Sequence, residues 1–182
     1  MSQDEKEKSH ARIVASASRL MRERGLAGTS VDDVMQAAGM SHGGFYKHFT
    51  SKDALAEAAV GAAFAQFIAL LDQGDPQVAV DTYRSQYLSD DHLSHPGLGC
   101  PVATLAQEVA RSPQASKANF GLAVRTLIGR LARVGKGSIQ NREAAAYREF
   151  SMIVGAVVIA RASDAATAAE VLDAVRRKSG HA

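Results

Sequence analysis

Residues 31–52, VDDVMQAAGMSHGGFYKHFTSK, constrain the fold of this chain more than any other stretch. Ser30 and Asp33 have the spacing of a capping box, which begins a helix, and Gly39 ends that helix because glycine turns left-handed without a Cβ penalty. The larger apolar side chains of this first helix recur at helical spacing, at Val31, Val34, Met35 and Ala38. The stretch therefore predicts two short helices joined by a tight turn, a helix-turn-helix.

The second helix of the pair, predicted over residues 42–49, divides its side chains between two faces. Phe45 and Phe49 lie four residues apart and are predicted to anchor the helix in a core. Two adjacent glycines cost about 1 kcal/mol each relative to alanine in a helix. That cost makes sense if a bulky partner approaches the backbone, as the floor of a DNA major groove does. The side chains predicted to contact the groove are His42, Gly43, Tyr46 and Lys47.

Residues at the edges of this unit are predicted to contact the DNA backbone. Ser41 is placed to cap the second helix, and we include it in the DNA-binding set. The start of the next helix, with its free amides near Ser51, suits a phosphate. The side chains predicted to hold phosphates are Thr29, Ser30, His48 and Lys52.

The run TSVDDVMQAAGMSHGGFYKHFTSKDAL, residues 29–55, resembles the DNA-binding domain of TetR-family (tetracycline-repressor-like) transcriptional regulators. The shared features are the capped helix, A-G-apolar-S in the turn, F-Y-x-H-F in the recognition helix and S-K-x-x-L at the start of the following helix. The resemblance covers roughly residues 10–60 and implies a DNA-binding domain over residues 1–52. Residues 53–182 would then form a helical domain for effector binding and dimerisation.

Composition supports an all-α protein with about nine helices. The 182-residue chain has few aromatic residues, no tryptophan, and four prolines that fall outside the strongly periodic segments. The net charge of +2 comes from residues 1–52, which hold eight Lys and Arg against six Asp and Glu, whereas the rest holds thirteen of each. This asymmetry agrees with nucleic-acid binding but is too small to demonstrate it.

Helical periodicity continues along the chain. Helices are predicted over about 9–24, 51–73, 76–88, 100–112, 113–134, 142–161 and 164–177, with a loop at 89–99. The first of these has an apolar stripe through Ile13 and Leu20, and its arginines are expected on a solvated face: Arg12, Arg19, Arg22 and Arg24.

The family resemblance also implies partners for the second domain. In TetR-like proteins the last two large helices, here about 142–177, pair with their copies to form a homodimer, which would read two halves of a double-stranded DNA operator. The middle helices would enclose a pocket for a small-molecule effector. Pocket candidates are Phe64, Phe67, Tyr83, Tyr87, Cys100, Leu105, Phe120 and Phe150, although core packing is the better explanation for each of them taken alone.

Cys100 permits a second hypothesis. It precedes Pro101 at the start of a predicted helix, where the helix dipole and free amides favour a thiolate and lower its pKa. An electrophile- or oxidant-sensing repressor would switch through this thiol; the alternative is a small buried hydrophobic residue. His92 and His95 also lie nearby and, with an aspartate at 90 or 91, suggest a zinc site whose spacing matches no compact zinc motif.

Other classes of function find less support in the sequence. No paired His, Asp and Ser set, phosphate-cradling loop or metal quartet indicates an enzyme, and no cofactor or metal is expected. A helical partner-binding module without DNA readout leaves the residue 41–52 pattern unexplained. The polar start, the single cysteine and the expected absence of a membrane-spanning stretch favour a cytoplasmic protein.

Overall fold

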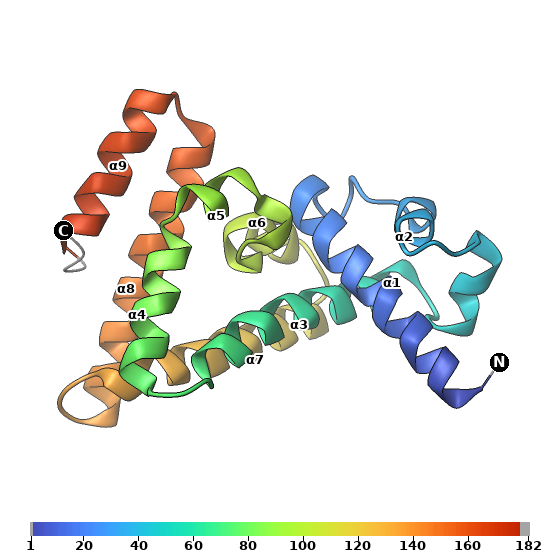
Figure 1. The fold of residues 1–182 in the computed structure, drawn as a ribbon, viewed down its shortest axis with the longest axis horizontal. Helices are drawn as coiled ribbons and strands as arrows, with labels where there is room; N and C mark the ends of the chain where they lie inside the picture. Colours follow the sequence, from blue (N-terminus) through green and yellow to red (C-terminus); the bar gives the residue numbers. More distant parts are fainter. Residues whose placement is uncertain (1, 179–182) are drawn as a thin grey trace.

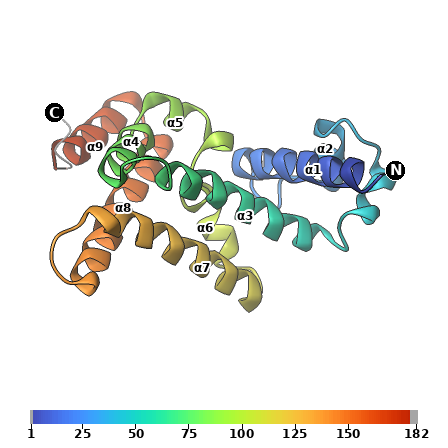
Figure 2. The ribbon, with the colours of Figure 1, turned by 60° about the horizontal axis from the view of Figure 1, so that its bottom comes forward.

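The computed structural model describes residues 2–178, and within that range the chain forms nine α-helices and three short 3₁₀ helices without a β-strand. The two termini lie at opposite ends of the molecule in both ribbon views (Figures 1 and 2). The all-α fold class is confirmed. The elements, in chain order, are α1 (Gln3–Arg24), α2 (Val31–Ala37), η1 (His42–Lys47), α3 (Lys52–Leu71), α4 (Pro76–Tyr87), α5 (Asp90–Ser94), η2 (Pro96–Leu98), α6 (Pro101–Val109), α7 (Gln114–Leu131), η3 (Ala132–Val134), α8 (Ile139–Ala162) and α9 (Ala165–Lys178).

The N-terminal elements share one hydrophobic cluster. Helix α1 starts six residues earlier than the periodicity predicts, because Ser2 and Glu5 form a capping box ahead of its charged first turns. The cluster joins the apolar stripe of α1 to α2, η1 and the first turns of α3; its buried members include Ile13, Leu20, Met21, Val34, Met35, Phe45, Phe49 and Leu55.

A second hydrophobic cluster fills the opposite end of the molecule, between α4, α7, α8 and α9 (Figure 1). Its buried side chains include Tyr83, Tyr87, Leu127, Ile128, Phe150 and Val157. The predicted loop at residues 89–99 is partly helical, since Ser89 caps α5 by accepting a hydrogen bond from the His92 amide at 3.2 Å.

Helix α3 connects the two clusters. Leu55 and Ala59 pack in the N-terminal cluster, whereas Leu71 packs in the second one. Of residues 2–178, α3 is the one helix long and apolar enough to cross a membrane by length and composition, so the expectation that no such stretch exists is wrong. In this structure apolar side chains at its two ends pack instead in the two hydrophobic clusters.

Candidate DNA-binding site

The start of α2 and the turn between α2 and η1 are built as the sequence predicts. Ser30 accepts a hydrogen bond from the Asp33 amide at 3.1 Å, and the Asp33 carboxylate accepts one from the Ser30 amide at 2.9 Å. Gly39 has a φ of 67°, and the Met40 amide donates to the Met35 carbonyl at 2.9 Å. These bonds fix the direction in which the chain enters η1.

The recognition element is a 3₁₀ helix that ends at Lys47, two residues before the predicted end of an α-helix. Its bonds include an i to i+3 pair between Ser41 and Gly44, and the Gly43–Gly44 pair disfavours a regular α-helix. Ser41 occupies the cap position, but its hydroxyl makes no capping bond within the described chain. Phe45 and Phe49 are both buried, with stacked rings 5.8 Å apart, as their spacing predicts.

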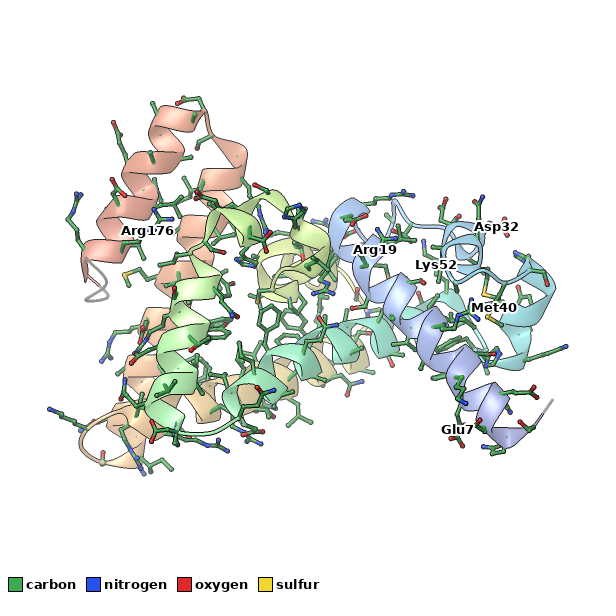
Figure 3. All side chains as sticks on the ribbon, in the orientation of Figure 1. Glu7, Arg19, Asp32, Met40, Lys52 and Arg176 are labelled. Atoms are coloured by element: carbon green, nitrogen blue, oxygen red, sulfur yellow. The ribbon has the colours of Figure 1, made fainter. Side chains whose placement is uncertain are left out.

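The opposite face of η1 is open to solvent. Tyr46 is 71% exposed, and its ring is steeply inclined to two neighbouring aromatic rings, with centroid distances of 5.2 Å to Phe45 and 6.3 Å to His42. His42 pairs with Asp32 of α2, which orients the imidazole beside Tyr46. Figure 3 shows Asp32, Met40 and Lys52 at this same end of the molecule. The exposed residues of this face are Ser41, His42, Gly43, Tyr46 and Lys47.

The two glycines of η1 have different surroundings. Among residues 2–178, nothing lies within 4 Å of a Cβ placed on Gly43, whereas a Cβ on Gly44 would lie 3.4 Å from Cε of Met35. Gly44 therefore lies against the N-terminal cluster at a distance that would still admit a Cβ. Gly43 has open space around it, and its backbone is exposed on the face described above.

Three residues of the predicted phosphate set lie away from the open face of η1. Thr29 is fully buried and its hydroxyl donates to the Gly25 carbonyl at 2.9 Å, so the predicted phosphate contact is wrong for this side chain. His48 is half-buried, 6.0 Å from the ring of His10, and burial lowers its pKa. Lys52 is also half-buried, at the first turn of α3.

The predicted effector-pocket residues mostly form a packed core. Tyr83 and Tyr87 are buried with their rings 5.5 Å apart, and Tyr87 lies 6.1 Å from Phe150. A cavity of about 420 Å³ lies elsewhere, between α3, α6 and α7 and beside the turn after α1. Of the eight predicted pocket residues, only Phe120 lines it. Cys100 was predicted from its thiol, and the other six from an apolar character that core residues share with pocket residues.

The sequence prediction for Cys100 is also revised. Its side chain is 1% exposed, and burial raises the pKa of the thiol, because loss of solvent outweighs the opposing electrostatic influence of Tyr87 and of the Val102 and Ala103 amides. Burial therefore favours the protonated thiol over the reactive thiolate. His92 Nε2 accepts a hydrogen bond from the Cys100 amide at 3.0 Å, and its Nδ1 faces the Tyr87 carbonyl. Residues 2–178 contain no group of three potential metal ligands close enough for a metal site.

Two charged residues that sequence reasoning did not select tie α1 to α6 and the chain before it. Arg22 is buried, not solvated, and donates to the Gly99 carbonyl at 2.7 Å; burial lowers its pKa to about 10. Glu108 of α6 accepts hydrogen bonds from the amides of Leu26 at 2.8 Å and Ala27 at 3.0 Å. Both bonds join residues about eighty positions apart, which no local pattern reveals.

Comparisons with known proteins agree with this arrangement. Residues 13–59 match the family described as bacterial regulatory proteins, tetR family. An uncharacterized HTH-type transcriptional regulator of Mycobacterium tuberculosis, found in two strains, is 33% identical over 103 residues, which cover 53% of this chain and 51% of the relative. This chain therefore spans about half the length of the curated relatives it matches.

Solved structures extend the likeness of the fold to nearly the whole chain. A TetR-family transcriptional regulator from Cytophaga hutchinsonii superposes with a TM-score of 0.75 at 22% identity, over 97% of this chain and 96% of that one. The reduced form of Escherichia coli NemR superposes with a TM-score of 0.73 at 20% identity, over 93% and 95% of the two chains.

Proposed function

We propose that the chain is a TetR-family transcriptional regulator, and that it acts in the cytoplasm as a homodimeric repressor of a palindromic operator, released by a small-molecule effector. The observation that carries this proposal is the division of η1. Buried Phe45 and Phe49 hold it rigidly, while Tyr46 and its neighbours project from the surface. An exposed aromatic side chain on a packed helix is expected on a surface that contacts DNA bases rather than on one that contacts water alone.

In this proposal the exposed face of η1 enters the major groove. Tyr46, His42 and Lys47 contact base edges, and Gly43 lets the backbone approach the groove floor. Ser30, Ser41, His48 and Lys52 contact phosphates at the margins of the groove. The free amides at the start of α3 favour a phosphate there as well.

Dimerisation is supported by the outer surface of α8. Phe150, Ile153 and Val157 face the core, whereas Tyr147, Val158 and Ile159 remain between 41% and 49% exposed. Large apolar side chains at such exposure favour burial against another protein surface. A second copy of α8 and α9 is the partner that the DNA geometry requires, since two recognition elements roughly 34–36 Å apart read successive major grooves.

Effector release is supported by the continuity of α3. This helix begins beside η1 and ends in the second cluster, so a change of packing around its middle alters the position of both ends. The effector must bind the DNA-incompetent arrangement more tightly than the competent one. The raised pKa of the buried Cys100 favours a non-covalent effector over a thiol switch.

Binding to DNA from the region upstream of the protein's own gene tests the proposal. Fluorescence anisotropy should give an affinity that falls steeply as salt rises, because phosphate contacts release counterions. The same fragment with one half of its palindrome scrambled is the control and should bind at least tenfold more weakly. Absence of binding even at low salt, or equal affinity for both fragments, would contradict the proposal.

A further inference from the structure

The cavity of about 420 Å³ combines apolar walls with fixed charge. Its volume falls within the range of small-molecule pockets, about 300–1,000 Å³. Leu26, Val60 and Phe120 supply apolar surface from three different segments of the chain. The ring of Phe120 packs nearly perpendicular to the ring of buried Phe64, with the two ring centroids 5.2 Å apart. Such a cavity accepts a molecule with a compact apolar body.

The charges of the cavity wall differ in how firmly they are held. Glu57 accepts a hydrogen bond from the Ser116 hydroxyl at 2.8 Å, and Glu108 is held by the two backbone amides described above. Lys52 and Arg111 also line the cavity, but the side chain of neither forms a hydrogen bond or ion pair within the described residues. Long cationic side chains extend into water readily. With Asp53 as a third carboxylate, the wall therefore carries net negative charge, −3 against +2, and its fixed part is negative.

Glu108 belongs to the cavity and to the DNA-binding unit at once. Its carboxylate holds the amides of Leu26 and Ala27, and both of these residues line the cavity as well. A Cβ on Gly25 would lie 2.8 Å from Glu108 Oε2, so the carboxylate sits directly against the turn that leads from α1 into α2. A cation in the cavity competes with these amides for the carboxylate, since a cationic donor adds charge–charge attraction that a neutral amide lacks.

Resting on the proposed effector-released repressor, we infer that this cavity is an effector site for a small organic cation with an apolar body. The ligand acts by drawing Glu108 away from the turn between α1 and α2. Loss of this tie frees the turn and, with it, the position of the helix-turn-helix relative to α6.

Direct titration with naphthylmethylamine tests the site without DNA. The chain lacks tryptophan, so the naphthalene fluorescence of the probe is observable against tyrosine alone. The amine should bind at least tenfold more tightly than neutral naphthylmethanol, and anionic naphthoate should bind most weakly. Equal binding of all three compounds, or tightest binding of naphthoate, would overturn the inference.

Three variants locate the bound probe. Gly61 lines the cavity and, among residues 2–178, nothing lies within 4 Å of a Cβ placed there, so Gly61→Leu should fill the space without a clash and weaken amine binding at least tenfold. Replacing glycine within a helix also favours folding. Glu57→Gln should weaken amine binding about threefold or more, whereas Glu170→Gln, on the exposed surface of α9, should leave it unchanged. An amine affinity that is the same in Gly61→Leu as in the wild-type protein would refute the site.

A final arm separates this inference from the proposed function. Saturating amine should lower operator affinity at least fivefold in the wild-type protein and leave it unchanged in Gly61→Leu. Amine binding that has no effect on operator affinity would overturn the effector assignment, while operator binding itself would still support the repressor. A protein that binds the amine but no operator would instead refute the proposed function.

Discussion

Gly43 and Gly44 occupy successive positions of η1, and close packing requires neither of them to lack a side chain. Gly44 lies against Met35 and Met40, whereas the space around Gly43 is open on the exposed face beside Tyr46. A residue that costs helix stability without filling a tight space points to a contact outside the chain. At this scale the surface of η1 is organised for a partner, and in our proposal that partner is DNA.

Replacing Tyr46 with alanine should weaken operator binding and little else. A lost base contact costs about 1–3 kcal/mol, roughly 5- to 150-fold in affinity. The side chain is mostly solvated, so the free energy of unfolding should change by less than about 0.5 kcal/mol. Anisotropy titration and chemical denaturation measure the two quantities, and Val78→Ala, an equally exposed apolar site on α4, is the control. An unchanged operator affinity would remove Tyr46 from the reading surface.

Sequence patterns predicted the residue-level site where the information was local. The Ser30–Asp33 capping box, the left-handed Gly39 and the buried Phe45–Phe49 pair follow from spacings of three or four residues. Thr29 was misassigned because a hydroxyl next to a cap looks the same whether it faces solvent or a carbonyl. Its bond to Gly25 became visible only with the conformation of the turn.

At the scale of elements, the segment from α5 to α6 is held by a hydrogen bond to the imidazole of His92. His92 Nε2 accepts the Cys100 amide, and burial together with Arg161 and Arg22 lowers the pKa of His92, partly offset by the Tyr87 carbonyl and by Asp91. The protonated ring would lose this acceptor while facing two cations. The tie therefore requires the neutral form.

This arrangement predicts a loss of stability in mild acid. Because the folded-state pKa of His92 lies below its unfolded value of about 6.5, the unfolded chain takes up the proton first, and stability falls as the pH drops below about 6.5. Thermal unfolding measured at several pH values from about 7.5 to about 5, a range that spans the pKa of a free imidazole, gives the dependence of stability on pH. His92→Gln, which keeps an acceptor but does not titrate, should reduce the slope, whereas replacement of exposed His95 should not. An identical slope in His92→Gln would contradict the assignment.

Periodicity identified most elements but not how they pair. The predicted boundaries of α4, α6 and α8 lie within about three residues of those observed, since caps and prolines mark them. The depth of each helix face was harder to predict: Arg22 is buried although it lies off the apolar stripe of α1. Its partners Gly99 and Gln66 come from segments that a one-dimensional pattern cannot bring together.

For the whole molecule, α3 and α6 determine how the helix-turn-helix sits on the rest of the chain. Helix α3 contributes to both hydrophobic clusters, and Glu108 and Arg22 add polar ties across the same junction (Figure 1). The cavity lies between three helices beside this junction, whereas the predicted pocket residues other than Phe120 lie outside it. Position in the fold, rather than residue type, marks the cavity.

The central claim is that two copies of this chain read one operator through η1. Hydroxyl-radical footprinting on the upstream fragment, combined with sedimentation of the complex, tests it most directly. We expect two protected windows on one face of the duplex, about 10–10.5 base pairs apart, with two protomers on each DNA and both windows lost together in Tyr46→Ala. A single protected window with one protomer per DNA, or protection that persists without Tyr46, would contradict the account.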